Sequence, residues 1–146
     1  MIKNERQYRI TKAQAQKFEQ ALAQLMQSKV AKQENPLLWQ VQGDALSSQI
    51  NDLQEELKEY EALTNRSPNQ PVILNLRSLS ELPFALIKAR IAAKLSQKAL
   101  ADRLGIKEQQ IQRYEATEYA SANLARVIEI SEALGLKLEL KGGLEM

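Results

Sequence analysis

The chain has 146 residues and a formal net charge of +2, and it contains no cysteine and no histidine. This composition excludes disulfides, thiolate or imidazole metal sites, and Ser-His or Cys-His catalytic arrangements. No stretch approaches the roughly 20 apolar residues that cross a bilayer, and the first residues lack the apolar core of a signal peptide. We therefore expect a cytoplasmic protein that is not an enzyme, holds no cofactor and does not enter a membrane.

Residues 1–63 carry the periodicity of two packed helices. From Thr11 to Met26 apolar residues are spaced three or four apart, whereas 30–35 is predicted to be a loop or a frayed helix end. Pro36 suits the first turn of a longer helix that extends to Leu63. Its apolar residues form an a/d heptad seam, which Gly43 interrupts: Trp39, Leu46, Leu53 and Tyr60, with Ile50 and Leu57 between them. Such a narrow stripe needs another helix, so a helical hairpin or coiled coil for dimerisation or partner binding is predicted.

Residues 64–71, T-N-R-S-P-N-Q-P, are predicted to be a linker, because two prolines among small polar residues cannot continue a helix. A second domain is placed at 72–146. It contains two stretches of alternating apolar residues, 72–76 and 136–140, and each is a candidate strand. A lone strand leaves its backbone groups unpaired, so these two are expected to pair with each other or across a dimer. The predicted fold class is mainly α, with one or two short strands.

The stretch from Ser96 to Glu115 has the pattern of two short helices joined at Gly105. Glycine at that position closes the first helix in the left-handed conformation, and Ile106 then packs into the corner. The apolar residues fall on one face of each helix: Leu100 and Leu104 on the first, Ile111 and Tyr114 on the second. This arrangement is typical of a helix-turn-helix, whose second helix enters the major groove of DNA.

Two further helices are predicted around this motif. One begins near Ser80, with Pro83 in its first turn. Its buried stripe is predicted to be Phe84, Ile87, Ile91 and Leu95. The other begins at Ser121 or Asn123 and ends at Gly135. Its predicted buried residues are Leu124, Val127, Ile128, Ser131 and Leu134.

Positive charge is concentrated on the same stretch. Residues 88–113 hold seven basic and two acidic side chains, whereas the chain from Tyr114 onward is net acidic. Neutralisation of DNA phosphates requires such a cluster. The alternative interpretation is a basic face that is merely solvated.

Three elements, L-S-Q-K-A-L-A-D-R-L-G-I, Q-Q-I-Q-R-Y-E and A-L-G-L, resemble in order and spacing the Xre/Cro/CI family of lambda-repressor-like DNA-binding domains. The resemblance covers about residues 80–136, under half of the chain. It implies that Gln97 and Lys98, at the start of the first helix of the motif, contact DNA phosphates. Lys107, just before the second helix, is expected to contact phosphate as well.

The outer face of the second helix is expected to contact base edges, because Ile111 and Tyr114 turn inward. Gln109 and Arg113 lie at the centre of that face, and Gln110 and Gln112 lie on its flanks. Glutamine pairs bidentately with adenine and arginine with guanine, each contributing about 1 to 3 kcal/mol of discrimination. We therefore expect Gln109 and Arg113 to contact bases.

The resemblance also implies a scaffold pair, Arg90 with Glu115, partly buried and not in contact with DNA. The chain departs from the family pattern at Lys107, where serine or threonine usually caps the helix. It departs again in the acidic loop that follows, where backbone N–H groups or Tyr119 are expected to replace basic phosphate contacts. The strand candidate at 136–140 stands where the family has a fifth helix, so dimerisation is expected to differ from that of the phage repressors.

These features predict a sequence-specific DNA-binding transcriptional regulator, a repressor or autoregulator that binds an inverted repeat of double-stranded DNA as a homodimer. Its half-sites are expected about 34 Å apart or a multiple of it. One narrower interpretation is an antitoxin whose N-terminal helices also neutralise a cognate toxin. The alternative function is a protein-interaction scaffold that uses the N-terminal helices and does not bind DNA.

Overall fold

The computed structural model describes residues 1–67 and 69–145, so Pro68 of the predicted linker lies outside the described residues. The chain divides into two compact units, Met1–Asn65 and Arg66–Met146. Helices make up most of the described part, which confirms the mainly α fold class. None of these helices is long and apolar enough to span a bilayer.

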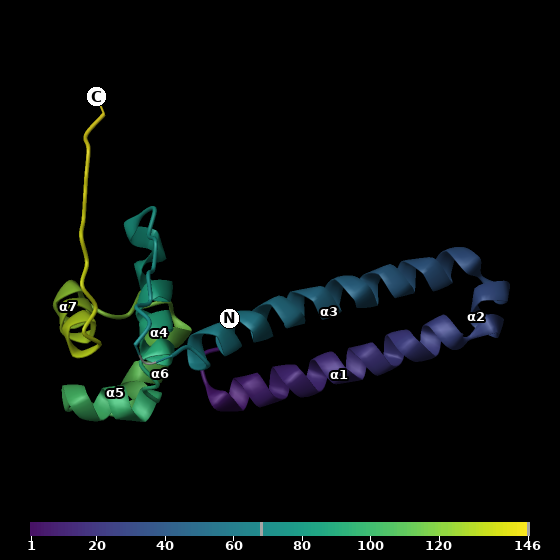
Figure 1. Ribbon diagram of the computed structural model, residues 1–146, viewed down its shortest axis with the longest axis horizontal. Coiled ribbons are helices and arrows are strands. Elements are labelled where there is room, and N and C mark those ends of the chain that lie inside the picture. The colour runs from purple at the N-terminus through teal and green to yellow at the C-terminus, as the bar shows by residue number, and fades with distance from the viewer. Residues whose placement is uncertain (68, 146) are drawn as a thin grey trace. The chain divides into compact units, whose positions relative to one another are not determined.

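The first unit is a helical hairpin of α1 (Glu5–Gln27), α2 (Lys29–Glu34) and α3 (Pro36–Thr64). Figure 1 shows α1 and α3 side by side, with the short α2 joining them at one end. The predicted heptad seam is the face of α3 that packs on α1, since Ile50, Leu57 and Tyr60 are buried there. The structure thus supplies, within one chain, the second helix that the seam requires.

Local capping explains where the hairpin differs from the sequence prediction. Helix α1 begins six residues before Thr11, because the Asn4 side chain accepts a hydrogen bond from the Gln7 N–H at 2.8 Å. The loop expected at 30–35 is wrong for most of its length, since α2 begins at Lys29. Here the Ser28 hydroxyl accepts the Ala31 N–H at 3.2 Å and starts the helix.

Polar contacts at both ends fix the two long helices against each other. Near the N-terminus the Tyr8 hydroxyl donates to Glu61 Oε1 at 2.6 Å, and the Tyr8 ring stacks on Tyr60 with centroids 5.1 Å apart. The hydrogen bond to Glu61 raises the pKa of Tyr8. At the other end the Trp39 indole N–H donates to the Leu25 carbonyl at 2.8 Å. These two hydrogen bonds satisfy the polar ends of Tyr8 and Trp39, so both rings can pack between α1 and α3.

Gly43 offers a test of the hairpin interface, and we expect Gly43→Ala to stabilise it by up to about 1 kcal/mol. A Cβ at this position would lie 2.8 Å from Met26 Cε, the mobile end of a side chain that is 46% exposed. Met26 can therefore move, and the gain in helix propensity dominates. Urea unfolding followed by Trp39 fluorescence measures the change. Ala45→Gly, the reverse exchange two residues along α3, should destabilise by a similar amount, and a loss of stability in Gly43→Ala would show that Met26 is held in place.

In its described residues the second unit contains a 3₁₀ turn, Leu79–Glu81, and four helices: α4 (Leu82–Ala92), α5 (Gln97–Leu104), α6 (Glu108–Ala116) and α7 (Leu124–Ala133). Pro83 lies in the first turn of α4 as predicted, but the helix begins two residues after Ser80. The core of the second unit is built from side chains of all four helices. The largest apolar members are Leu86, Ile87, Leu100, Ile111 and Ile130, none of which is exposed to solvent.

The two predicted strands are wrong for the single chain. Neither 72–76 nor 136–140 is a strand in the structure, because no described segment lies beside either one to form a ladder. The predicted buried face of α7 is also partly wrong. Leu124 and Ile128 are 73% and 48% exposed, and Ile130 is the residue that enters the core. In α4, Phe84 of the predicted stripe lies at the surface in the same way.

Candidate nucleic-acid interface

The turn between α5 and α6 is fixed by its backbone. Ser96 caps α5, since its hydroxyl accepts the Ala99 N–H at 3.0 Å. At the other end Gly105 has φ 68°, and the Ile106 N–H donates back to the Ala101 carbonyl at 3.0 Å. A residue with a side chain would be strained at this φ. Because Ala101 is buried and small, α5 and α6 approach each other closely, and the crossing angle of a helix-turn-helix follows.

An ion pair holds the inner side of α6. Arg90 of α4 donates from Nε to Glu115 Oε2 at 2.9 Å and from Nη2 to Glu115 Oε1 at 2.7 Å. Its Nη1 donates to the Leu95 carbonyl at 2.9 Å. One guanidinium thus connects α4 with α6 and with the segment between α4 and α5. The predicted pair is confirmed, and its burial is more complete than expected, with side-chain exposures of 3% and 1%. Both groups lie away from solvent and act as scaffold.

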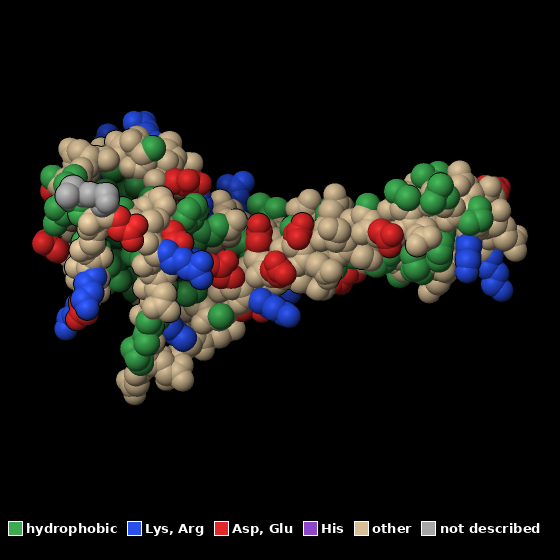
Figure 2. Space-filling view, turned by 90° about the horizontal axis from the view of Figure 1, so that it is seen from above, with side chains coloured by type: hydrophobic (Ala, Val, Ile, Leu, Met, Phe, Trp, Pro, Cys, Tyr) green, Lys and Arg blue, Asp and Glu red, His purple; other side chains and the backbone are tan. Residues whose placement is uncertain are grey.

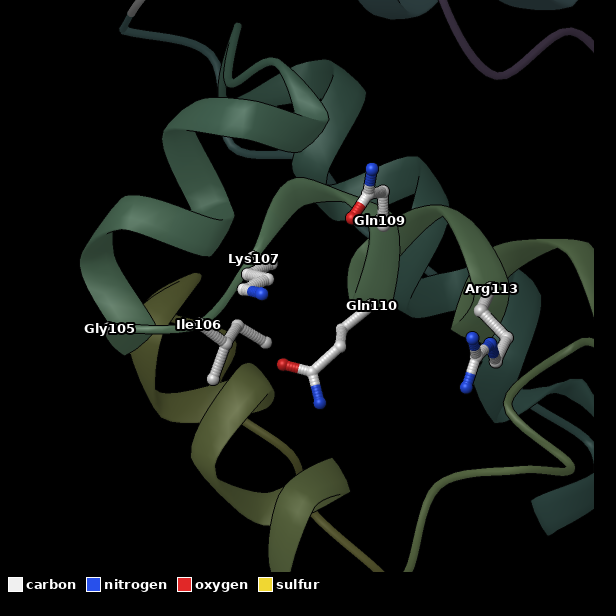
Figure 3. Close-up of a pocket in the computed structure, with 6 residues that line it drawn as sticks. All are labelled: Gly105, Ile106, Lys107, Gln109, Gln110 and Arg113. Atoms are coloured by element: carbon white, nitrogen blue, oxygen red, sulfur yellow. The ribbon is translucent and has the colours of Figure 1, made fainter.

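The outer side of α6 presents polar side chains to solvent. Gln109, Gln110 and Arg113 are exposed there, as is Lys107 just before the helix. With Gly105 and Ile106 they line an open cavity of about 630 Å³ at the turn. In Figure 3 the side chains of Gln110 and Arg113 extend to the same side of α6, and that of Gln109 extends to the other. The motif therefore offers amide and guanidinium groups over a broad face, as contact with base edges requires.

The remaining predicted site residues have different surroundings. The Gln112 amide donates to Glu108 Oε1 at 3.4 Å within α6, and Gln112 does not line the cavity. The Gln97 amide donates to Glu115 Oε1 at 3.4 Å, so this side chain is half-buried against the ion pair. Lys98, the next residue of α5, is exposed. The link from Gln97 to the ion pair had no signal in the sequence, because it depends on how α5 and α6 cross.

Lys107 gives α6 an unusual beginning. It is the N-cap residue, yet its side chain accepts no hydrogen bond from the described first turn, in contrast to Ser96 on α5 and Asn123 on α7. The expected loss of the side-chain cap is confirmed. Glu108 in the first turn offsets the positive end of the helix dipole in part. The N–H groups of this turn lie at the same end of α6 as the cavity.

The loop after α6 contains no glycine, but two of its residues have positive φ, Glu118 at 53° and Tyr119 at 61°. The Tyr119 ring is 6% exposed and stacks on Tyr114 with centroids 5.9 Å apart. Burial, with a smaller contribution from Glu115, raises the pKa of Tyr119. The expectation that Tyr119 contacts phosphate is therefore wrong, because packing places this side chain in the core. Backbone N–H groups remain the candidates in this loop.

Residues 86–141 match the protein-family model described as Helix-turn-helix. The match covers less than half of the chain and includes α5, the turn and α6 in full. Searches of curated proteins and of solved structures found no significant match. The fold, the cavity at the turn and this match agree that the second unit carries a helix-turn-helix domain, a class of DNA-binding regulatory domain.

Proposed function

We propose that the protein is a sequence-specific DNA-binding transcriptional regulator that represses transcription by binding an inverted repeat as a homodimer. The observation that supports this best is the asymmetry of α6. Its inner side is fixed by the buried Arg90–Glu115 pair, and its outer side exposes Gln109, Gln110 and Arg113. A rigid helix with hydrogen-bonding side chains on its free face suits insertion into the major groove.

The predicted site residues have different roles in this proposal. Gln109 and Arg113 contact base edges, with Gln110 and Gln112 at the margins of the contact. Lys98, Lys107 and the Gln97 amide contact the phosphates on either side of the groove. Gln97 also donates to Glu115, so the phosphate contact is coupled to the ion pair that holds α6.

Binding to the DNA upstream of the protein's own gene tests the proposal. A footprint should protect two half-sites on one face of the duplex, with centres about 34 Å apart or a multiple of it. Competition with a scrambled fragment separates sequence-specific from non-specific binding. Equal affinity for both fragments would contradict a regulator that recognises a sequence, and absence of binding at low salt would contradict DNA binding itself.

Salt dependence tests the phosphate contacts separately. We expect the double variant Lys98→Ala with Lys107→Ala to reduce the slope of log affinity against log salt by about 1 for each lysine, so by about 4 in a homodimer. Both lysines are exposed, so the fold should persist. Lys58→Ala, an exposed lysine of α3, is the matched control and should leave the slope unchanged. An unaltered slope in the double variant would place the phosphate contacts elsewhere.

A second function, binding of a protein partner by the hairpin, is supported by the apolar surface at its α2 end. Figure 2 shows hydrophobic side chains gathered there. The exposed residues are Met26, Val30, Leu37, Leu38 and Val41. A patch of this kind is typical of an interaction site, and a toxin bound there would make the protein an antitoxin. If the protein does not bind DNA, this surface would instead be that of an interaction scaffold.

Co-purification with the product of the adjacent gene tests the antitoxin interpretation. Val30→Asp with Leu37→Asp should abolish the complex, because both side chains are well exposed in the free protein and would be desolvated in it. Arg113→Ala is the control that should impair DNA binding and leave the complex intact. If the complex persisted in the double aspartate variant, this surface would not be the site that binds the partner.

A further inference from the structure

The segment that follows α7 has an amphipathic pattern but no partner within the chain. Leu138 and Leu140 are 40% and 72% exposed, and Lys137 and Glu139, on either side of Leu138, are exposed as well. Figure 1 draws this part as a nearly straight trace leading away from α7. Within the described chain, the backbone of 137–141 makes no hydrogen bond to another residue. Alternating leucines and unpaired backbone groups are the features of an edge strand before it pairs.

The way the segment leaves α7 is fixed. Gly135 has φ 68°, its N–H donates to the Glu132 carbonyl, and the Leu136 N–H donates to the Ser131 carbonyl, each at 3.0 Å. This pattern of two bonds across a left-handed glycine is a Schellman cap. It ends the helix and sets the direction of the chain at Leu136. The segment therefore starts from a rigid base, which lowers the entropy cost of ordering it against a partner.

We propose that residues 136–140 pair antiparallel with the same residues of a second copy, in a two-fold symmetric register centred on Leu138. Leu136 then lies opposite the second copy's Leu140, and the two Leu138 side chains face each other. On the other face Lys137 lies opposite Glu139, twice by symmetry. This pairing rests on the proposed function in one respect, namely that the protein is a homodimer, and it specifies how the two copies pair.

The charges select this register among the alternatives. Antiparallel pairing centred on Lys137 or Glu139 sets lysine against lysine or glutamate against glutamate, and parallel in-register pairing does both. A shift by one residue places Leu138 on the same face as a charged residue of the partner strand. Centring on Leu140 pairs Glu139 with Lys141, but it sets Leu138 against Gly142 and Lys137 against Gly143, so one leucine and one charge of each strand lack a partner. The register at Leu138 is the one that matches both faces.

Charge complementarity also favours a second copy of 136–140 over the other unpaired segment, 72–76. That segment contains only apolar residues and Asn75, so it offers no partner to Lys137 or Glu139. The helix that precedes 136–140 exposes two more large apolar side chains, Leu124 and Ile128. Large apolar side chains are thus exposed both on α7 and in the segment that follows it, as expected where a second subunit covers them.

Charge reversal in the full-length chain tests the proposal without DNA. Lys137→Glu gives a chain with glutamate at both positions, and Glu139→Lys gives one with lysine at both. Each variant alone should raise the dimer dissociation constant by about tenfold or more, and the chain with both changes should recover it. An equimolar mixture of the two single variants should form mainly heterodimers by native mass spectrometry. Unchanged dissociation constants, or a statistical mixture in which half of the dimers are heterodimers, would overturn the proposal.

Cysteine cross-linking tests the register, because the chain has no cysteine of its own. Leu138→Cys should form a covalent dimer under mild oxidation, since residues directly opposite in an antiparallel pair are within disulfide range. Lys137→Cys should react at least tenfold more slowly, because its own symmetry mate lies diagonally across the strand pair, about 7 to 8 Å away. Comparable reaction at Lys137→Cys and Leu138→Cys would indicate parallel strands, and faster reaction at Lys137→Cys or at Leu140→Cys would indicate an antiparallel register centred on that residue. Either result overturns the proposal, whereas loss of DNA binding with intact cross-linking at Leu138→Cys would count against the proposed function alone.

Discussion

Replacing Glu115 with alanine is expected to lower the free energy of unfolding of the helix-turn-helix domain by about 3 to 5 kcal/mol. The cost arises from Arg90, which would keep its charge at 3% side-chain exposure after losing both carboxylate oxygens. Only the bond from its Nη1 to the Leu95 carbonyl, at 2.9 Å, would remain of the three described above. Moving the guanidinium to solvent instead would disrupt the packing that buries it.

Hydrogen exchange of the buried amides of α5 and α6 measures this change in the domain concerned. The single tryptophan, Trp39, lies in α3, so its fluorescence reports the hairpin during the same denaturation. Glu132→Ala removes an exposed carboxylate from α7 and should change stability by less than about 0.5 kcal/mol.

A double-mutant cycle separates the ion pair from simple loss of side-chain volume. Arg90→Ala with Glu115→Ala should cost clearly less than the sum of the single variants, because neither then leaves a buried charge unpaired. Arg90→Met with Glu115→Leu, which fills the same space with apolar groups, should come close to the wild-type stability. Additive single effects would show that the two side chains contribute independently.

The parts of the fold that the sequence predicted well are those determined by local pattern. The left-handed glycine at 105 and the spacing of Leu100, Leu104 and Ile111 indicated the helix-turn-helix without any knowledge of its neighbours. The heptad seam of α3 likewise indicated that another helix covers it. It could not indicate whether that helix belongs to the same chain, because the pattern describes only one side of the interface.

The errors have a common physical origin, since they concern groups whose environment depends on distant parts of the chain or on a partner. Tyr119 looked like a loop residue available to phosphate, but its positive φ turns the ring into the core against Tyr114. Leu124 and Ile128 fitted a buried helical stripe, yet the core of a single chain reaches only Ile130. The alternation at 136–140 signalled a strand, but a strand forms only where a second backbone is present.

The sequence predicted which residues form the candidate site but not which of them lie together. The structure separates those that line the cavity at the turn from those that are bonded elsewhere. Gln109, Gln110, Arg113 and Lys107 share one cavity, whereas Gln112 is bonded within α6 and Gln97 is bonded to Glu115. The helical wheel alone placed Gln110 and Gln112 equally on the flanks. Only the position of the turn relative to α6 distinguishes them, since Gln110 lies on the side of Ile106.

The variant with Gln109→Ala and Arg113→Ala is expected to lose about a thousandfold or more in its preference for the operator over unrelated DNA. Each side chain supplies about 1 to 3 kcal/mol of discrimination when it contacts a base edge bidentately, and a homodimer loses both in each half-site. Both residues are exposed and their side chains are not part of the core, so the fold should be retained.

Two matched variants show whether discrimination or charge is lost. Arg113→Lys keeps the positive charge but cannot reproduce the guanidinium fork, so it should retain non-specific binding and its salt slope while losing preference for the operator. Gln112→Ala removes the same amide as Gln109→Ala from a residue outside the cavity, and it should cost less. Competition binding at fixed salt, with operator and scrambled fragments, compares the wild type, the double variant, Arg113→Lys, Gln112→Ala and Gln109→Ala. If Gln112→Ala proved as damaging as Gln109→Ala, the face of α6 that enters the groove would be rotated away from the cavity at the turn, and the base contacts would have to be reassigned around Gln112 and Glu108.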